Sequence, residues 1–536
     1  MDGDRVAMNF STRVGRQVLI AIPVLFLVIF FVWPVLSILR LGLAPEGALD
    51  LAPLLDVLND ATLWSVAWFT LWQAVLSTVI TLVIALPGAY VLSRYRFRGR
   101  GLARALVTVP FVLPTVVVGA AFTSLGVSRS LTAILLAHVF FNYAIVVRTV
   151  GSLWSHIDDR EQQAARVLGA GRVRTFVSIT LPTLRPAIGA ATAIVFLFCF
   201  TSFGVILILG GPGYATIETE IYRQTAQHLN LETAAVLSLF QLGAVIAALA
   251  VSNRMSGDRI ALSTLRPADQ NTLPVIGRRR IMLGVNLFVI ALLIGLPMTQ
   301  LVVRSFDGGL DGYRGLTRTT FGFAEPPISA VWTSLQYALI ATVLAVFVGG
   351  SAAFALVRRR ERAKGRLLNL LVMLPLGISA VTVGFGFLVT FDAAPFELRS
   401  SPAIIPIAHA LIAIPFVVWL MVPVLTAINP RQREAAAVLG ANPSRVWWEI
   451  DFPIGLRAAL VAAGFAAAIS LGEFGATLFI VRPDTVTLPV VIFRLLGRPG
   501  QEMYSQAMAA STLLMFLTAG SVLAIERLRS PHATVF

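Results

Sequence analysis

The side chains most able to do chemistry in this sequence are polar groups that stand inside long apolar stretches. Glu473 lies in the run SLGEFG, and a related run, TSFG, carries Ser202 and Phe203 in another apolar stretch. A carboxylate among apolar residues needs a cavity or a polar partner, because burying its charge alone is unfavourable. Glu473 could attract a cationic ligand along a path lined by Phe203 and Phe474, or it could be a structural carboxylate bonded to a neighbouring helix. We take Ser202, Phe203, Glu473 and Phe474 as the candidate substrate pathway.

Two histidines, His138 and His409, also lie in apolar stretches. A metal site needs several ligands, and neither histidine has a second histidine or a carboxylate at ligand spacing. We predict that both make hydrogen bonds between helices, and we predict no metal site. The single cysteine, Cys199, has no disulfide partner in the chain and is interpreted as a packing residue.

The sequence has no motif for nucleotide hydrolysis. Its only lysine, Lys364, is followed by Gly365, so the phosphate-binding pattern G-x-x-x-x-G-K-[ST] does not occur. A membrane enzyme such as a lipid-linked transferase would need clustered acids or histidines at one membrane face, and neither half of the sequence has such a cluster. We therefore predict that the chain is not an enzyme and has no cofactor of its own.

The elements that position these residues must be membrane helices. The chain has 536 residues, of which 57% are hydrophobic and 13% charged, too little charge to cover a soluble protein of this length. A span needs about 20 apolar residues, and it must be helical because lipid offers the backbone no hydrogen-bond partner. The sequence predicts an all-α polytopic membrane protein with about 12 transmembrane helices. The expected spans are 18–40, 63–93, 103–126, 130–153, 185–210, 232–252, 281–303, 331–357, 367–391, 402–427, 457–481 and 504–526.

The basic residues predict the orientation of these spans. The net charge of +15 raises the possibility of nucleic-acid binding, but the basic residues fall in short clusters between apolar stretches. With a cytoplasmic N-terminus and twelve spans, 32 Lys and Arg lie on the inner side and 10 on the outer side, which sum to the 42 in the chain. This asymmetry follows the positive-inside rule, so we expect both termini in the cytoplasm and no nucleic-acid partner. The apolar run from Val18 is too long for a signal peptide and is expected to remain as the first span.

The chain repeats itself. Segment 163–182 matches segment 434–453 at an offset of 271, with 9 of 20 positions identical, and an offset of 265 aligns Gly119 with Gly384. Two parallel halves of six helices could form a translocation path along their interface, although some secondary transporters share this arrangement. The expected divisions are a first permease half over 1–252, a cytoplasmic linker over 253–280 and a second permease half over 281–536.

The best-matched segments lie between the fourth and fifth spans of each half, on the cytoplasmic side. Their pattern is E/Q-A-A-x-x-x-G, nine residues, then I-x-[LF]-P. The alanines favour a helix that another protein can approach closely, and Gly169 and Gly440 can adopt positive φ in a sharp bend. Pro182 and Pro453 suit the first turn of the following helix. One copy would fit an ordinary surface hairpin, whereas two copies at equivalent sites favour a pair of docking loops.

These residues resemble the EAA loop of binding-protein-dependent ABC importer permeases. The resemblance implies a permease of the bacterial plasma (inner) membrane whose loops fit clefts in a dimer of cytoplasmic ATP-binding-cassette ATPase subunits, where ATP and Mg bind. It also implies an extracytoplasmic solute-binding protein as a partner. The first loop departs from the pattern with a glutamine where the acid is expected, which predicts unequal contacts at the two loops. The coupling residues identified in this way are Gln163, Ala164, Ala165, Gly169, Glu434, Ala435, Ala436 and Gly440.

Other stretches resemble one branch of this family. AHVFFN from residue 137 and LGGPG from residue 209 are similar to the thiamine and ferric-iron branch, and the following TIE and IY are closer to thiamine permeases. The resemblance implies thiamine as the solute, with ferric iron as the alternative. Arg223 and Arg494 fall in outer segments, where they would contact the external receptor or lipid head groups.

An ion-gradient-driven secondary transporter is the competing class of protein. Such a transporter would not need paired ATPase-docking loops. Uptake into vesicles that follows a proton or sodium gradient and ignores ATP would establish it.

Overall fold

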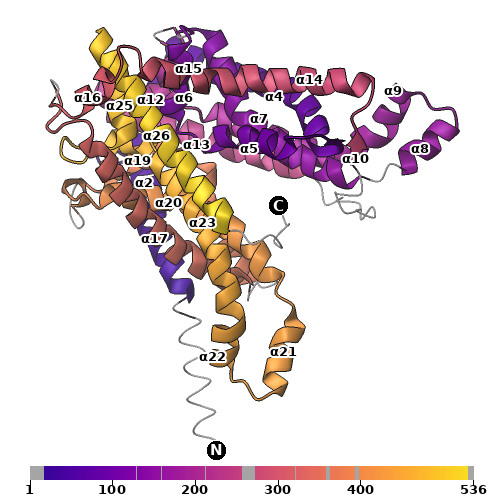
Figure 1. Ribbon diagram of the computed structural model, residues 1–536. Helices are drawn as coiled ribbons and strands as arrows, with labels where there is room; N and C mark the ends of the chain where they lie inside the picture. The colour runs from indigo at the N-terminus through magenta and orange to yellow at the C-terminus, as the bar shows by residue number, and fades with distance from the viewer. Residues whose placement is uncertain are drawn as a thin grey trace, which may run out of the picture. The chain divides into compact units, whose positions relative to one another are not determined.

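The computed structural model describes residue 17 and residues 19–127, 129–157, 160–211, 213–255, 272–319, 322–357, 363–392 and 397–528. Over these ranges the chain is built of helices, apart from one short parallel ladder of two strands (Figure 1). Nine of the described helices are long and apolar enough to cross a membrane, or eleven if each of two bent pairs is one span. The twelfth expected span, 504–526, falls on α26 (Gln501–Leu528). The predicted all-α polytopic class is confirmed.

The helices form two compact units, each described here by itself. The first, called the α4 unit, comprises the described parts of Leu55–Glu220 and Phe240–Asp307. Its elements are α4 (Ala61–Arg94), β1 (Tyr95–Arg96), α5 (Arg100–Val112), α6 (Thr115–Ser124), α7 (Leu131–His156), α8 (Arg160–Val167), α9 (Arg172–Thr175), η2 (Phe176–Thr180), α10 (Leu181–Phe200), α11 (Gly204–Leu209), β2 (Leu273–Pro274), α14 (Arg278–Ile290), η4 (Ala291–Gly295) and α15 (Leu296–Ser305).

The second, called the α20 unit, comprises the described parts of Met1–Leu54, Ile221–Leu239 and Gly308–Val535. Three helices, α3 (Ala52–Asn59), α12 (Ile217–Ala226) and α13 (Leu231–Met255), begin in one unit and end in the other. Besides α26, the elements of the α20 unit are η1 (Val28–Val32), α2 (Trp33–Leu43), α16 (Asp311–Leu316), α17 (Ser329–Val357), α18 (Ala363–Met373), η5 (Leu374–Gly377), α19 (Ala380–Thr390), η6 (Leu398–Ser400), α20 (Ile404–Thr426), α21 (Pro430–Val438), α22 (Pro443–Val446), η7 (Trp447–Asp451), α23 (Phe452–Gly472), α24 (Gly475–Ile480) and α25 (Leu488–Leu496).

Equivalent helices form the centre of each unit. In the α4 unit, α4 packs along α7, and α10 packs on both; in the α20 unit, α17, α20 and α23 pack on one another in the same way. The first span of each sequence half packs elsewhere. Span Leu19–Leu43 contacts α19 and α20 within the α20 unit, whereas α14 and α15 contact α4 and α6 within the α4 unit. The units therefore differ from the sequence halves at their first spans, and the divisions 1–252 and 281–536 stay a prediction drawn from the repeat.

Helix α4 shows how these sequences fit a membrane. A stripe of large apolar side chains along one face is exposed, and it consists of Trp64, Trp68, Leu71, Val75, Val79 and Val83. The opposite face is buried and carries small polar groups at helical spacing, namely Thr70, Gln73, Ser77 and Thr81. Lipid contacts the apolar stripe, while the polar groups find hydrogen bonds inside the protein. One of the candidate polar residues, His138, bonds Ser77 on this inward face.

Four expected spans are not single straight helices. The third expected span, 103–126, bends by 108° between α5 and α6, and the ninth, 367–391, bends by 100° before α19. The fifth and eleventh break, because α10 ends at Phe200 and α23 ends at Gly472 before a short second helix begins. The expected spans 103–126, 185–210, 367–391 and 457–481 are therefore helical but bent or broken. Apolar composition alone does not report where a helix axis turns.

A second irregularity of the helices is the π turn, which occurs before prolines. Among the described residues, the π turns η1, η2, η4 and η7 each end two residues before a proline, and these prolines are Pro34, Pro182, Pro297 and Pro453. A proline has no N–H to donate to residue i−4, and its ring crowds that carbonyl, so widening the preceding turn relieves the clash. Pro182 and Pro453 lie in the first turn of α10 and α23, as predicted.

The linker is described only at its ends. Its C-terminal residues form β2, which pairs in parallel with β1 in the α4–α5 loop. The Tyr95 hydroxyl also reaches Met282 Sδ, at 3.4 Å, on α14. The expected linker 253–280 is therefore anchored at this end, and its residues 256–271 lie outside the described residues.

Candidate functional site

The first candidate docking loop is a helix–turn–helix hairpin beyond the end of α10 (Figure 1). Gln163, Ala164 and Ala165 lie on α8, and the chain reverses at Gly169, where φ is +86°. The amide of Leu168 donates to Ala164 O at 3.0 Å, and that of Ala170 donates to Ala165 O at 2.9 Å. These bonds satisfy the last carbonyls of α8, as in a Schellman turn, which requires the left-handed conformation that glycine supplies.

The second loop has the same geometry 271 residues later. Glu434, Ala435 and Ala436 lie on α21, and φ at Gly440 is +83°. Leu439 N donates to Ala435 O at 3.0 Å, and Ala441 N donates to Ala436 O at 2.9 Å. The predicted positive φ at both glycines is confirmed. A Cβ at Gly169 or Gly440 would meet nothing within 4 Å, so the backbone conformation alone requires glycine there.

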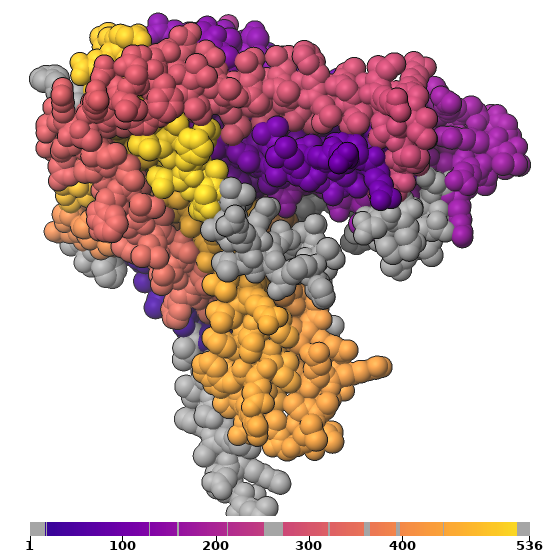
Figure 2. Space-filling view, viewed as in Figure 1, coloured from indigo at the N-terminus to yellow at the C-terminus, as the bar shows by residue number. Residues whose placement is uncertain are grey.

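Each hairpin presents an apolar pair that the sequence reasoning missed. Val167 and Leu168 are each 87% exposed, and so are their equivalents Val438 and Leu439. The 430–450 segment stands on the surface in Figure 2. Both helices are otherwise polar, so an apolar pair at their ends is available to a protein partner. The signal was present in the repeat, because V-L precedes the glycine in both copies.

The candidate pathway residues occupy the two helix breaks. Ser202 and Phe203 lie between α10 and α11 in the α4 unit, and Glu473 and Phe474 lie between α23 and α24 in the α20 unit. The second helix of each broken span has six residues. Short half-helices at corresponding positions of two repeats are a typical place for a transport site, because their ends offer free backbone groups.

Glu473 uses its carboxylate inside the protein. Oε1 accepts from Ala476 N at 2.9 Å, and Oε2 accepts from Thr477 N at 3.0 Å and from Thr477 Oγ1 at 2.6 Å. The side chain is 4% exposed, and His409 Nε2 lies 3.3 Å from Oε2. These donors belong to the first turn of α24, where a helix favours negative charge. This geometry matches the structural alternative, a carboxylate bonded to a neighbouring helix.

Each histidine connects such a break to the neighbouring helices by hydrogen bonds. His138 on α7 bonds Ser77 Oγ through Nδ1 and Ser202 Oγ through Nε2, both at 2.9 Å. His409 on α20 bonds Ser470 Oγ through Nδ1 and Thr477 Oγ1 through Nε2, both at 2.8 Å. The predicted interhelical hydrogen bonding is confirmed. The His138 ring connects α7 to α4 and to the break after α10. The His409 ring connects α20 to the helices on the two sides of the other break, α23 and α24.

The aligned glycines Gly119 and Gly384 lie where helices touch. A Cβ at Gly384 would come within 2.7 Å of the Ala476 backbone on α24. A Cβ at Gly119 would come within 2.9 Å of the Ile208 side chain on α11. In both units the bent span therefore packs tightly on the short half-helix. The sequence identified this pair only as a match in the repeat.

The remaining expected residues do not lie within the breaks. Arg223 lies on α12, and Arg494 lies half-buried on α25. Burial, followed by the charge of Arg498, lowers the pKa of Arg494. Cys199 is fully buried in α10. Among the described residues no three His, Cys, Asp or Glu side chains are grouped in a way that could hold a metal ion.

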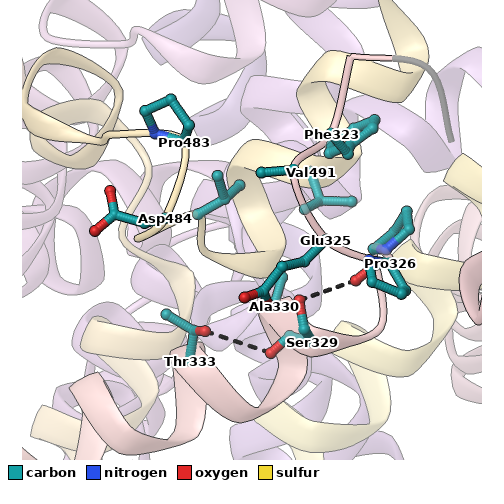
Figure 3. Close-up of a pocket in the computed structure, with 12 residues that line it drawn as sticks. Phe323, Glu325, Pro326, Ser329, Ala330, Thr333, Pro483, Asp484 and Val491 are labelled. Atoms are coloured by element: carbon teal, nitrogen blue, oxygen red, sulfur yellow. Dashed lines mark hydrogen bonds between the residues drawn. The ribbon is translucent and has the colours of Figure 1, made fainter. Parts of the chain in front are cut away.

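A shallow pocket lies between the segment that leads into α17 and the segment that leads into α25 (Figure 3). Glu325 and Asp484 contribute carboxylates to its lining, and Asp484 Oδ2 lies 2.8 Å from Arg482 Nη2. Ser329 Oγ donates to Pro326 O at 2.9 Å and closes the turn before α17. The predicted topology places the pocket on the outer face, and none of the site residues expected from the sequence lines it.

Paired hairpins on two repeated bundles of apolar helices are the features of a permease of the ABC importer type. The family model of the binding-protein-dependent transport system inner membrane component matches residues 81–256. The chain is also 30% identical over 479 residues to the thiamine transport system permease protein ThiP of Brucella abortus, covering 82% of this chain and 83% of that protein. The chain belongs to this family of inner membrane permeases.

Other relatives fit the same assignment. The thiamine transport system permease protein ThiP of Salmonella typhimurium is 29% identical over 516 residues, covering 91% of this chain and 92% of that protein. The molybdate/tungstate transport system permease protein WtpB of Pyrococcus abyssi is 29% identical over 210 residues, which is 39% of this chain and 79% of that protein. Most of this relative therefore corresponds to less than half of the chain. This agrees with a chain that consists of two repeated halves.

Proposed function

We propose that this chain is the permease of an importer that moves thiamine into the bacterial cytoplasm. The observation that carries the substrate is the similarity to proteins named thiamine transport permeases over 82–91% of the chain. Thiamine is a cation with an aromatic ring system, and the breaks carry Phe203 and Phe474 as aromatic side chains. The predicted ferric-iron alternative is tested in the same assay.

Both hairpins dock onto ATPase subunits in this proposal. The supporting observation is that the two loops share their Schellman turn and their exposed apolar pair, so each presents one surface to one subunit of a dimer. ATP and Mg bind to those subunits, and the permease itself does not hydrolyse ATP. A solute-binding protein delivers the substrate from outside, and both termini of the permease face the cytoplasm.

The proposed substrate pathway runs past the two helix breaks, at Ser202, Phe203, Glu473 and Phe474. The short helices α11 and α24 support this placement, because interrupted helices at corresponding positions of two repeats are a typical place for a transport site. Within this proposal Glu473 shapes the break rather than holding the solute, since its carboxylate is already bonded to α24.

Reconstitution of the permease with its ATPase and binding protein in proteoliposomes tests the function. In vesicles whose lumen corresponds to the cytoplasm, ATP enclosed in the lumen should drive uptake of radiolabelled thiamine. Ferric iron should not be taken up. Collapse of proton and sodium gradients by ionophores should leave the uptake rate unchanged. Uptake that follows the ion gradient without ATP would establish the secondary transporter, and ATP-driven uptake of ferric iron alone would overturn the assignment of thiamine.

A further inference from the structure

The two docking hairpins differ in an ion pair that joins the two arms of the second one. In the second hairpin, Arg433 Nε on α21 lies 2.8 Å from Asp451 Oδ1, the last residue of η7. This pair joins the outgoing and returning arms on either side of the turn at Gly440. In the first hairpin the equivalent positions, at the same offset of 271, hold Gln162 and Thr180, neither of which carries a charge. The difference therefore lies in what connects the arms, while the turns and apolar pairs are the same.

Burial makes this pair different from an ordinary surface ion pair. The Asp451 side chain is 9% exposed and that of Arg433 is 36% exposed. Because Asp451 has so little access to water, its attraction to the Arg433 guanidinium is weakly screened by salt. The neighbouring pair Arg445–Glu449 also joins Nε to a carboxylate at 2.8 Å, but its side chains are 67% and 60% exposed. Exposed pairs of that kind contribute little.

We propose that the Arg433–Asp451 ion pair fixes the orientation of α21, so that the second hairpin is set for its ATPase subunit before the two meet. This inference rests on the proposed docking function of the hairpins. A helix of nine residues joined by a short turn does not hold one orientation by its own hydrogen bonds. Ordering it in advance lowers the entropy lost on docking, which raises affinity without any new contact.

The first test measures orientation in the permease alone. Spin labels on the exposed residues Gln432 and Leu456 report the distance between α21 and α23, and the buried Cys199 is left in place. We expect a narrow distance distribution in the parent protein and a distribution about twice as wide in R433Q/D451T, which copies the first hairpin. The charge-reversed variant R433D/D451R should be narrow again. A width that does not change in R433Q/D451T would overturn the proposal.

The second test measures coupling in the complete transporter. R433Q/D451T should weaken ATPase binding about tenfold and raise the ATP hydrolysed per molecule of solute taken up, whereas R433D/D451R restores both. The control E449S copies Ser178 of the first hairpin and removes only the exposed pair, so it should match the parent. A broadened distribution with unchanged ATPase binding and coupling would refute the role in docking. If the double variant G169V/G440V, in which both turns are strained, binds the ATPase as tightly as the parent permease, the docking function itself is wrong, whatever the distance distribution shows.

Discussion

At the scale of single residues, Glu473 shows how a polar group inside a membrane protein can be fully used by the fold. Its two oxygens accept three hydrogen bonds from Ala476 and Thr477. The equivalent residue in the first half, Ser202, bonds His138 instead. Each break thus has an equivalent histidine, His138 or His409, but the residue at the break differs, Ser202 in one and Glu473 in the other. The carboxylate is the stronger acceptor, because a charged group forms shorter and stronger hydrogen bonds than a hydroxyl.

We expect Glu473→Gln to lower the stability of the permease. Glutamine has one acceptor oxygen, so its amide nitrogen would face a backbone N–H of α24, and an unmet buried donor costs about 1–3 kcal/mol. The midpoint of thermal unfolding in detergent should fall, and uptake of thiamine should fall with it. Ser202→Ala is the matched control at the other break. If Glu473→Gln keeps the parent midpoint but binds thiamine more weakly, the carboxylate contacts the solute instead.

The aligned glycines give a second prediction at this scale. Gly384→Ala should destabilise the permease by about 1–3 kcal/mol, because the new methyl group would meet backbone atoms of Ala476 that cannot move aside. Gly119→Ala should cost less, since the group it meets is the Ile208 side chain. Thermal midpoints of the two variants, measured side by side, check the order. A larger loss for Gly119→Ala would show that the contact at α24 is looser than described.

At the scale of elements, the hairpins were predicted well and the broken spans were not. The conformation of Gly169 and Gly440 depends on a few neighbouring residues, so a local motif was enough to predict it. The breaks near Phe203 and Phe474 depend on partners far along the chain, such as His138 and His409. Nor does hydropathy fall at these breaks, because SFG and EFG are flanked by apolar residues on both sides. The unit in which the first span of each sequence half packs is likewise decided by contacts with distant residues, which no local pattern reports.

The hairpin turns can be tested through backbone strain alone. Gly169→Val and Gly440→Val should each cost about 1–3 kcal/mol locally, since valine disfavours positive φ. Gly171→Val is the matched control: its φ is −64°, and a Cβ there also meets nothing within 4 Å. Co-purification of the ATPase should drop for the first two variants and stay normal for the control. Equal co-purification of all three would show that the turn geometry is not needed for docking.

Charge adds a difference between the two elements. Glu434 is exposed on α21, and the equivalent residue on α8 is Gln163. Salt screens contacts between exposed charges, so docking at the second hairpin should weaken more as ionic strength rises. G169V leaves the second hairpin intact, and G440V leaves the first intact. Co-purification of the ATPase should therefore fall more steeply with salt for G169V than for G440V. Adding Glu434→Gln to G169V should reduce its salt dependence to that of G440V. A salt dependence that is the same in all three proteins would exclude a charged contact at this position.

At the scale of the whole molecule, the repeat supports the proposal that one chain binds two ATPase subunits. Two units with equivalent central helices each carry one hairpin, and each hairpin presents the same turn and the same apolar pair. A relative that matches 39% of this chain shows the scale of a single half. Fusion of two halves allows them to diverge, as they have at Glu473 and Ser202 and at Arg433 and Gln162. Divergence predicts that the two hairpins are both required and are not interchangeable.

The last prediction concerns the division of labour between this chain and its ATPase. The purified permease should hydrolyse no ATP, because its sequence has no phosphate-binding loop, and hydrolysis should begin only when the ATPase is added. Serine replacements of each apolar pair, V167S/L168S and V438S/L439S, should each reduce solute-stimulated hydrolysis about tenfold, since docking loses most of its apolar contact. Leu49 is also an exposed leucine, 76% exposed, and the predicted topology places it in an outer segment away from the ATPase. The control L49S should therefore behave as the parent. Turnover by the isolated chain would refute the assignment as a permease without ATPase activity. Full stimulation in either serine variant would show that one hairpin suffices, and the prediction that both hairpins are required would then be wrong.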